Sequence, residues 1–303
     1  MRTSTVRRVG LSVAVAAALT SVAACGGSDK DDSGKAGSDT GSVVKADSIS
    51  ALLTVQKKTG AASSAKVEGT TTMGSTMSMK QSGALDWSDG ITGAMTIAYT
   101  GGDMADSMKK LGSDGTMQAR YFKDGYAADM GAALAQQTGG KRWISYSYDD
   151  LAAIGGASGA AMQEQMQNTS PDQGVKPLLA SGDVKKVGKE NVRGVTTTHY
   201  SGTVDVADLT AKTSKLDAEQ LTALKKQLND AGITTEKVDI WVDGNDLLVK
   251  KTERGQMKTG ELNSTVFYSD YGTKVSAERP PAGETIEFKD LLKQQQGATA
   301  GAS

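Results

Sequence analysis

Very few side chains in this 303-residue sequence could do acid–base, nucleophilic or metal chemistry, because it contains one histidine and one cysteine. His199 stands in Thr196-Thr-Thr-His-Tyr200, where strand alternation puts it on the opposite face from Tyr200 and Val204. A zinc site would need mainly carboxylate ligands, which is unusual, and a Ser-His-Asp triad lacks a Gly-x-Ser-x-Gly elbow near a suitable turn. We predict a strand histidine with a local hydrogen bond, no metal, no cofactor and no enzyme. A hydrolase that uses His199 is the remaining alternative.

Asp243-Gly-Asn-Asp246 carries some of the acids of a calcium loop, but position 5 of an EF-hand would fall on Leu247. Asp-Gly between two alternating apolar segments is typical of a hairpin turn. The sequence therefore predicts a turn at this point and not a calcium site.

The single cysteine, Cys25, ends a segment with the order of an export signal. Residues 1–10 carry three arginines and no acid, residues 11–24 are apolar, and Val22-Ala-Ala24 places small residues before the cysteine. The apolar stretch is shorter than the ~20 residues that a membrane-spanning helix needs. Val-Ala-Ala-Cys resembles a lipobox, so we predict a signal peptide over 1–24 and a diacylglycerol-modified Cys25. An ordinary secretory signal with a chance cysteine is the alternative.

Lipidation of the only cysteine would exclude disulfides, thiol catalysis and iron–sulfur clusters. Two acyl chains suffice for stable anchoring, which places the protein on the extracytoplasmic face of the cell membrane. Loss of residues 1–24 shifts the formal charge from −1 to about −4, so nucleic acid is not an expected partner. We expect a monomer that is attached to the membrane through this lipid anchor.

Composition divides the chain into four parts. Gly, Ser, Asp and Lys dominate 25–46, which we predict to be a disordered tether, and 293–303 is predicted to be a disordered tail. Between them lies a domain over 47–292. The whole chain has 36 glycines and only four prolines, which favours a β-rich fold with many turns for this domain.

Helical spacing over Ile49–Thr59 predicts a first helix, with Asp47 or Ser48 as its N-cap. Thr213–Ala231 predicts a second helix, with a capping box at Ser214–Asp217 and Gly232 as its end. Asp150–Asn168 is typical of weak helices, and Glu284–Lys293 of a short strand or helix. Alternating patterns predict strands at Ala65–Thr72, Thr76–Trp87, Gly93–Thr100, Gln118–Asp124, Tyr126–Met130, Arg142–Tyr148, Asp183–Val187, Val195–Val206, Val238–Val242, Asp246–Thr252 and Glu261–Tyr271.

Ten of the twelve methionines lie between Met73 and Met166. Methionine fills irregular apolar space or lines surfaces that accept varied partners, so the cluster predicts either core filler or an adaptable apolar groove. The stripe of leucines on the second helix could cover that groove, or could be an ordinary core-packing face. The residues predicted to line the cavity are Met77, Met79, Met95, Ile97, Tyr99, Met117, Leu221, Leu224, Leu228 and Ile240.

Several segments together resemble the LolA/LppX-like lipoproteins of actinobacteria. The resemblance covers about residues 47–292 and rests on the order of the segments along the chain. The similar segments are Tyr121-Phe-Lys-Asp-Gly-Tyr126, Gly139-Gly-Lys-Arg-Trp-Ile144, Val192-Arg-Gly-Val-Thr-Thr-Thr-His-Tyr200, Val238-Asp-Ile-Trp-Val-Asp243, Leu247-Leu-Val-Lys250 and Pro280-Pro281.

This resemblance implies an α+β fold: a half-open antiparallel β-barrel of about eleven strands, with helices on its concave face and an apolar cavity between sheet and helices. It implies binding of a lipid, glycolipid or acyl chain, and a role as an envelope carrier. Thr and Ser fill many positions that could face inward, so a filled barrel is the alternative. In that case the protein would be a non-enzymatic interaction or scaffold lipoprotein, accessory to a cell-envelope complex.

Overall fold

The computed structural model describes residues 40–110, 112–153, 170–181, 183–208 and 232–293, together with positions 218, 222, 225, 226, 229 and 230. Cys25, the signal peptide, the tether up to residue 39 and the tail from residue 294 lie outside these residues.

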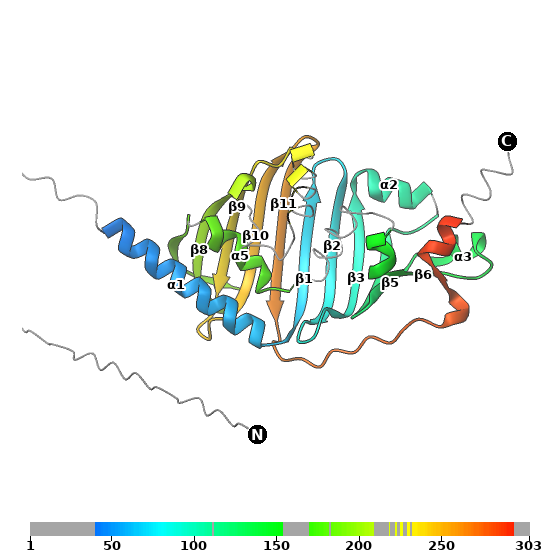
Figure 1. Ribbon diagram of the computed structural model, residues 1–303, viewed down its shortest axis with the longest axis horizontal. Coiled ribbons are helices and arrows are strands. Elements are labelled where there is room, and N and C mark those ends of the chain that lie inside the picture. The colour runs from blue at the N-terminus through cyan, green and yellow to red at the C-terminus, as the bar shows by residue number, and fades with distance from the viewer. Residues whose placement is uncertain are drawn as a thin grey trace, which may run out of the picture. The chain divides into compact units, whose positions relative to one another are not determined.

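A single sheet organises the described residues (Figure 1). Its twelve strands are β1 Ser64–Met73, β2 Met77–Asp86, β3 Thr92–Gly101, β4 Thr116–Phe122, β5 Gly125–Asp129, β6 Trp143–Ser147, β7 Lys185–Val192, β8 Val195–Asp205, β9 Thr235–Val242, β10 Leu248–Met257, β11 Gly260–Ser269 and β12 Thr285–Glu287.

The strands lie in the order β12-β6-β5-β4-β3-β2-β1-β11-β10-β9-β8-β7. All neighbours are antiparallel except β12, which pairs with β6 in parallel. No ladder joins β7 to β12, so the sheet is not closed by hydrogen bonds among the described strands. The predicted half-open antiparallel barrel is therefore confirmed, with twelve strands in place of about eleven.

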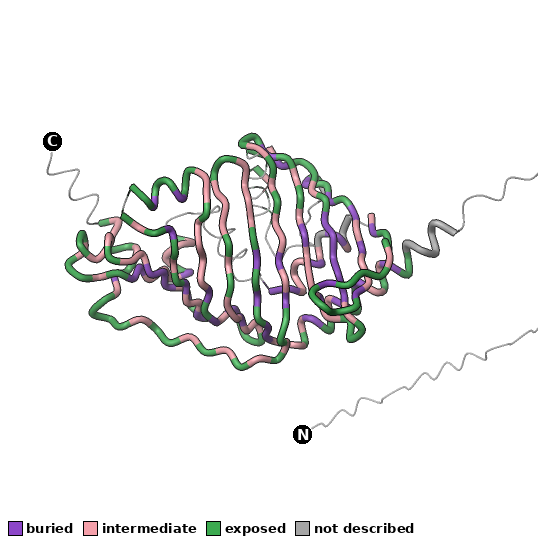
Figure 2. Tube along the Cα trace, turned by 180° about the vertical axis from the view of Figure 1, so that it is seen from behind, coloured by how far each residue is buried: buried purple, intermediate pink, exposed green. Residues whose placement is uncertain are grey.

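The named helices are α1 Thr40–Ala61, α2 Gly102–Lys110, α3 Gly131–Gln137 and α5 Lys176–Ser181, with single 3-10 turns at η1 Gln173–Val175, η2 Val206–Asp208 and η3 Ala282–Glu284. In Figure 1, α1 and α5 lie in front of the strands at the β8–β10 side of the sheet. Figure 2 shows the sheet from behind, with buried stretches toward both of its ends.

The start of the first helix corrects the sequence prediction. α1 begins at Thr40, so residues 40–46 are helical although they were predicted as tether, and neither Asp47 nor Ser48 is the N-cap. Ser42 to Thr59 contains no glycine or proline, so no helix-breaking residue stops the helix from extending backward.

The main core joins α1 and α5 to one face of the sheet, which we call the inner face. Leu52 and Val55 of α1 and Leu178 of α5 pack with buried residues of β1, β3, β8, β9 and β10. Gly202 of β8 allows the backbone before β7 and the side chain of Leu178 to approach closely, because a Cβ there would lie 1.7 Å from the Asp183 carbonyl oxygen and 2.6 Å from Leu178 Cδ1. Any larger residue at this position would displace the backbone at Asp183.

The predicted strands are confirmed, with shifts of a few residues at their ends. Phe122 pairs with Gly125, so the β4–β5 turn is centred on Lys123 and Asp124. The 243–246 turn is confirmed, since the Asp243 carboxylate accepts hydrogen bonds from the amides of Asn245 and Leu247.

Several other elements differ from the sequence patterns or complete them. α2 and α3 were not predicted. The Glu284–Lys293 segment contains both a strand, β12, and a helix over 288–293. The described positions of Thr213–Ala231 are helical, and of Asp150–Asn168 only 150–153 are described, also as helix.

An extended segment over residues 270–281 connects β11 to η3 and β12. Figures 1 and 2 show it running along the ends of the middle strands to reach β6. Ala277 packs against Phe122 and Trp143, and the Arg279 guanidinium lies 2.5 Å from Asp124 Oδ1 in the β4–β5 turn. This connection therefore ties the last strand to the far edge of the sheet.

Candidate functional site

Half-buried apolar side chains line the inner face of β2, β3 and β4. Met79 pairs with Tyr99 and Ile97 pairs with Met117, so these four lie side by side on one face, and Met77 continues the row along β2. All five are of intermediate exposure. The structure therefore brings together five of the predicted cavity residues as one apolar strip.

The other predicted cavity residues divide into two groups. Met95 is 4% exposed and Ile240 is 0% exposed, and both belong to the main core. Both side chains pack within the main core of the described residues, and their place in a cavity wall stays a prediction. Leu221, Leu224 and Leu228 lie outside the described residues.

A row of tyrosines extends the strip toward the β6 edge, and the sequence reasoning missed it. Tyr121 stacks on Tyr126 with ring centroids 6.1 Å apart, and Tyr126 stacks on Tyr146 at 4.5 Å. Phe288 adds a further ring 4.9 Å from Tyr146. Burial raises the pKa of all three tyrosines, so their hydroxyls stay protonated. The sequence did place these tyrosines in three neighbouring predicted strands, and this placement could have indicated the row.

Buried charges occupy another part of the inner face, on β9 and β10. Lys251 Nζ lies 2.5 Å from Glu253 Oε1, and the Lys251 side chain is 13% exposed. A Cβ at Gly174 would lie 3.0 Å from this ammonium group, so η1 covers it. Burial, followed by the charge of Glu253, raises the pKa of Glu236 to about 7.

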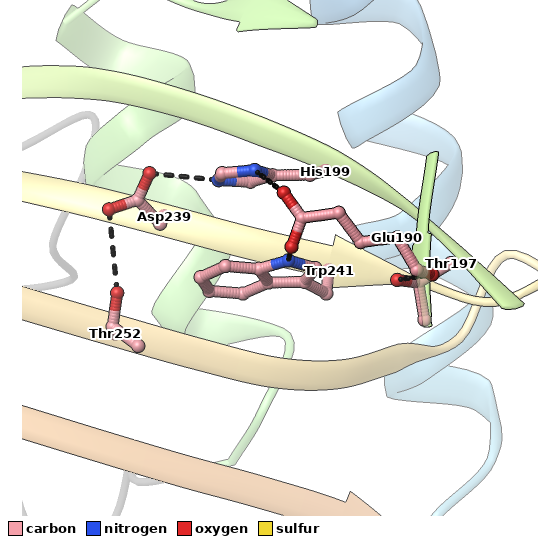
Figure 3. A network of polar contacts seen from close by, with 6 residues as sticks. All are labelled: Glu190, Thr197, His199, Asp239, Trp241 and Thr252. Atoms are coloured by element: carbon pink, nitrogen blue, oxygen red, sulfur yellow. Dashed lines mark hydrogen bonds and ion pairs between the residues drawn. The ribbon is translucent and has the colours of Figure 1, made fainter. Parts of the chain in front are cut away.

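The single histidine lies on the outer face, in a network of polar contacts (Figure 3). His199 Nδ1 is 2.8 Å from Glu190 Oε1 and its Nε2 is 2.9 Å from Asp239 Oδ1. Trp241 stacks on the imidazole at 4.3 Å and donates its indole N–H to Glu190. Thr252 donates a hydrogen bond to the second oxygen of Asp239. The predicted local hydrogen bond of His199 is confirmed, and the ring has a carboxylate at each nitrogen.

The network stabilises its carboxylates in the charged form. Burial alone would raise the pKa of Asp239, but hydrogen bonds from Ser201 and His199 outweigh it and lower that pKa. Hydrogen bonds from Trp241 and His199 likewise lower the pKa of Glu190. An imidazole held on both sides is not placed to take a proton from a substrate hydroxyl, so the geometry is that of a structural network.

Within the described ranges, no group of three or more His, Cys, Asp or Glu side chains is arranged to hold a metal ion. Over the same ranges, no helix combines the length and apolar character that crossing a membrane requires.

The comparison with protein families finds no family model that matches. Two relatives do match over most of their length. A 31.2 kDa protein of the rplA–rplJ intergenic region of Streptomyces griseus is 68% identical, covering 86% of this chain and 85% of that protein. The "Putative lipoprotein SCO4650" of Streptomyces coelicolor is 45% identical, covering 97% of this chain and 99% of that protein. The chain belongs to this family of Streptomyces lipoproteins.

Two solved structures resemble this chain. LppX of Mycobacterium tuberculosis covers 77% of the chain with 14% identity and a TM-score of 0.47, over 99% of its own length. LprF of Mycobacterium bovis covers 77% with 11% identity and a TM-score of 0.39, over 98% of its own length. At these values the two resemblances carry no information about a ligand.

The expectation of a lipoprotein agrees with the name of the 45% identical relative. The open sheet, covered on one face by helices, is the fold expected from the sequence. As a lipoprotein, the chain belongs to the cell envelope.

Proposed function

We propose that this lipoprotein is held on the extracytoplasmic face of the membrane by a diacylglycerol on Cys25, and that it binds an apolar ligand on the inner face of its sheet. The ligand would be an acyl chain or lipid, and the strip formed by Met77, Met79, Ile97, Tyr99 and Met117 would receive it. The observation that carries this proposal is the intermediate exposure of all five apolar side chains on one continuous surface.

The inner face of the sheet is covered differently near β9 and near β2. On β9, every residue from Val238 to Val242 is buried, beneath α1 and α5 for those that face inward. On β2, Leu85 is the only buried residue. Packing against α1 and α5 thus explains why the inner face is buried near β9. The methionine strip keeps exposed apolar area, and a ligand that buried it would gain about 25 cal/mol of binding free energy per Å².

The residue types of the strip suit a long apolar ligand. Methionine is flexible and polarizable, so its side chains adapt to chains of different length and branching. A single polar residue, Gln81, interrupts the β2 part of the strip between Met79 and Gly83. We infer a carrier or sensor that recognises its ligand mainly by shape and apolar contact.

Native mass spectrometry tests this proposal. A Cys25→Ser chain, secreted without its own lipid, should carry adducts with lipid masses after purification without detergent. Met79→Lys should abolish the adduct by placing a charge in the strip. Ser82→Lys puts the same charge on the outer face of the same strand and should retain it.

The opposite result would favour the alternative function. A Cys25→Ser chain that carries no adduct, even after incubation with vesicles of phosphatidylglycerol and phosphatidylethanolamine, would overturn lipid binding. A scaffold lipoprotein with a filled barrel would then be the better account.

A further inference from the structure

The chain that leads from Cys25 enters the fold at the β7 edge of the sheet. α1 ends at Ala61, just before β1 in the middle of the sheet, and it also contacts β7 at the sheet's edge. Figure 1 shows the helix crossing from the β8 side toward β1, so its start lies at the β7 end. Thr40 follows Cys25 by fifteen positions, which span at most ~50 Å when fully extended. A diacylglycerol on Cys25 would therefore tether the sheet by this edge.

Lysines line the same edge and lack acidic partners. Lys185, Lys186 and Lys189 of β7 are all exposed. Lys186 and Lys189 form no ion pair with any described residue, and Lys185 has only a 4.0 Å contact with Asp183. Glu190 is the one acid of the strand, and it is engaged in the network on the outer face. The edge strand therefore presents a surplus of positive charge to its surroundings.

Exposed apolar side chains gather around these lysines. Among the described residues, the large apolar side chains that are exposed are Leu53, Met104, Val187 and Val195. Val187 has the highest exposed fraction, 56%, and stands between the lysines of β7. Leu53 belongs to α1 and Val195 to β8, so three of the four belong to elements that meet at this edge. Met104 lies on α2, which contacts β2 and β3.

Basic and apolar side chains on one surface suit a bilayer that carries anionic head groups. The ammonium groups are attracted to the lipid phosphates, and small apolar side chains can enter the head-group region. Lysines on a free edge strand also hinder pairing with other chains, but that role needs their charge alone. It does not explain why Val187 is exposed among them on the edge nearest the predicted anchor.

We infer that the β7 edge, formed by Lys185, Lys186, Val187, Lys189 and Val195, is a docking surface for the anionic head groups of the membrane. The inference rests on the lipid anchor of the proposed function, and it does not depend on the ligand of the inner face. Docking through this edge would fix the orientation of the sheet relative to the bilayer, whereas the anchor alone would leave the orientation free.

Fluorescence quenching on the full lipidated chain tests the surface. In this chain lipidation occupies the Cys25 thiol, so Val187→Cys offers a single position for an environment-sensitive fluorophore. The chain is inserted into vesicles of phosphatidylglycerol and phosphatidylethanolamine that contain a lipid with a nitroxide on its head group. The fluorophore at position 187 should be strongly quenched. Met104→Cys is the matched control, because it replaces another exposed apolar side chain and lies away from the β7 edge, so its fluorophore should be quenched little.

Charge variants show whether the lysines cause the contact. Replacing Lys185, Lys186 and Lys189 by glutamine should lower the quenching at position 187 to that at position 104, because each lysine at an anionic surface strengthens the association about fivefold. Lys80→Gln, Lys109→Gln and Lys110→Gln together remove the same charge from β2 and α2, and this combination should leave the quenching unchanged. All six lysines are exposed, so neither set of substitutions should lower the melting temperature.

Several results would overturn the docking surface. Equal quenching at positions 187 and 104, equal quenching in vesicles of phosphatidylcholine alone, or the same loss in both lysine variants would each do so. A chain that does not float with the vesicles would overturn the lipid anchor, and the docking surface with it. A chain that floats but shows no preference for position 187 would overturn the docking surface alone, so the two failures are distinguishable.

Discussion

At the scale of single residues, His199 joins two strands through the carboxylates on either side of its ring. Asp239 is 6% exposed at its side chain, and the imidazole Nε2 lies 2.9 Å from its Oδ1. We predict that His199→Ala lowers the free energy of unfolding by about 2–4 kcal/mol, because it leaves a buried carboxylate without that partner. Denaturant unfolding at neutral pH measures this loss.

Glu190→Gln is the matched control for this prediction. Glu190 is 45% exposed at its side chain, so solvent can replace its contact with the ring, and the loss should be smaller. Equal stability of His199→Ala and the unchanged protein would contradict the structural role.

Glu236 predicts a pH dependence with a definite sign. Its ordinary pKa is 4.5, and in the fold it is raised to about 7. The folded state then binds more protons than the unfolded state between these values, so the contribution of this group is full below pH 4.5 and is lost as pH rises through about 7. The expected loss is on the order of 2 kcal/mol.

Unfolding curves measured from pH 4.5 to pH 8, with and without Glu236→Gln, check this dependence. The glutamine variant should show a flatter profile, because its side chain stays neutral in both states. A profile of unchanged slope would assign the dependence to other groups.

At the scale of elements, the methionines of β2 and β3 should respond differently to the same truncation. Met95 is buried in the main core, so Met95→Ala should cost about 2–5 kcal/mol of unfolding free energy. Met79 is half-buried on the strip, and Met79→Ala should cost less than about 1.5 kcal/mol and reduce ligand retention.

Thermal unfolding and native mass spectrometry of the two variants separate core from binding surface. If Met79→Ala destabilised the fold as much as Met95→Ala, the strip would be core packing and not a ligand surface.

The strands were predictable because their alternation is local, whereas their partners were not. β12 has three residues and pairs in parallel with β6, and no local sequence pattern predicts this pairing. α2 and α3 follow glycines that take positive φ, and their short apolar spacing did not stand out from the surrounding turns. Likewise the sequence predicted a hydrogen bond for His199, but Glu190 and Asp239 come from two other strands and could not be identified from spacing.

At the scale of the whole molecule, the proposed lipid anchor on Cys25 would decide at which surface the sheet works. We predict that Cys25→Ser releases the protein from the membrane fraction into the medium, because the variant would lack the two acyl chains that the proposal assigns to Cys25. Fractionation followed by immunoblotting measures this shift. A Cys25→Ala variant should behave in the same way, and membrane retention of both would show that another part of the chain holds it.

The strand order has a consequence for how this protein is made. β1 to β6 form the early half of the chain, yet their two outer strands, β1 and β6, find their partners in β11 and β12 near its end. If the chain is exported N-terminus first, as the proposed lipid anchor implies, β1 and β6 would each expose an unpaired edge until β11 and β12 emerge. Such edges invite pairing with other chains, so the arrival of β11 and β12 would close two sites at which exported chains could aggregate.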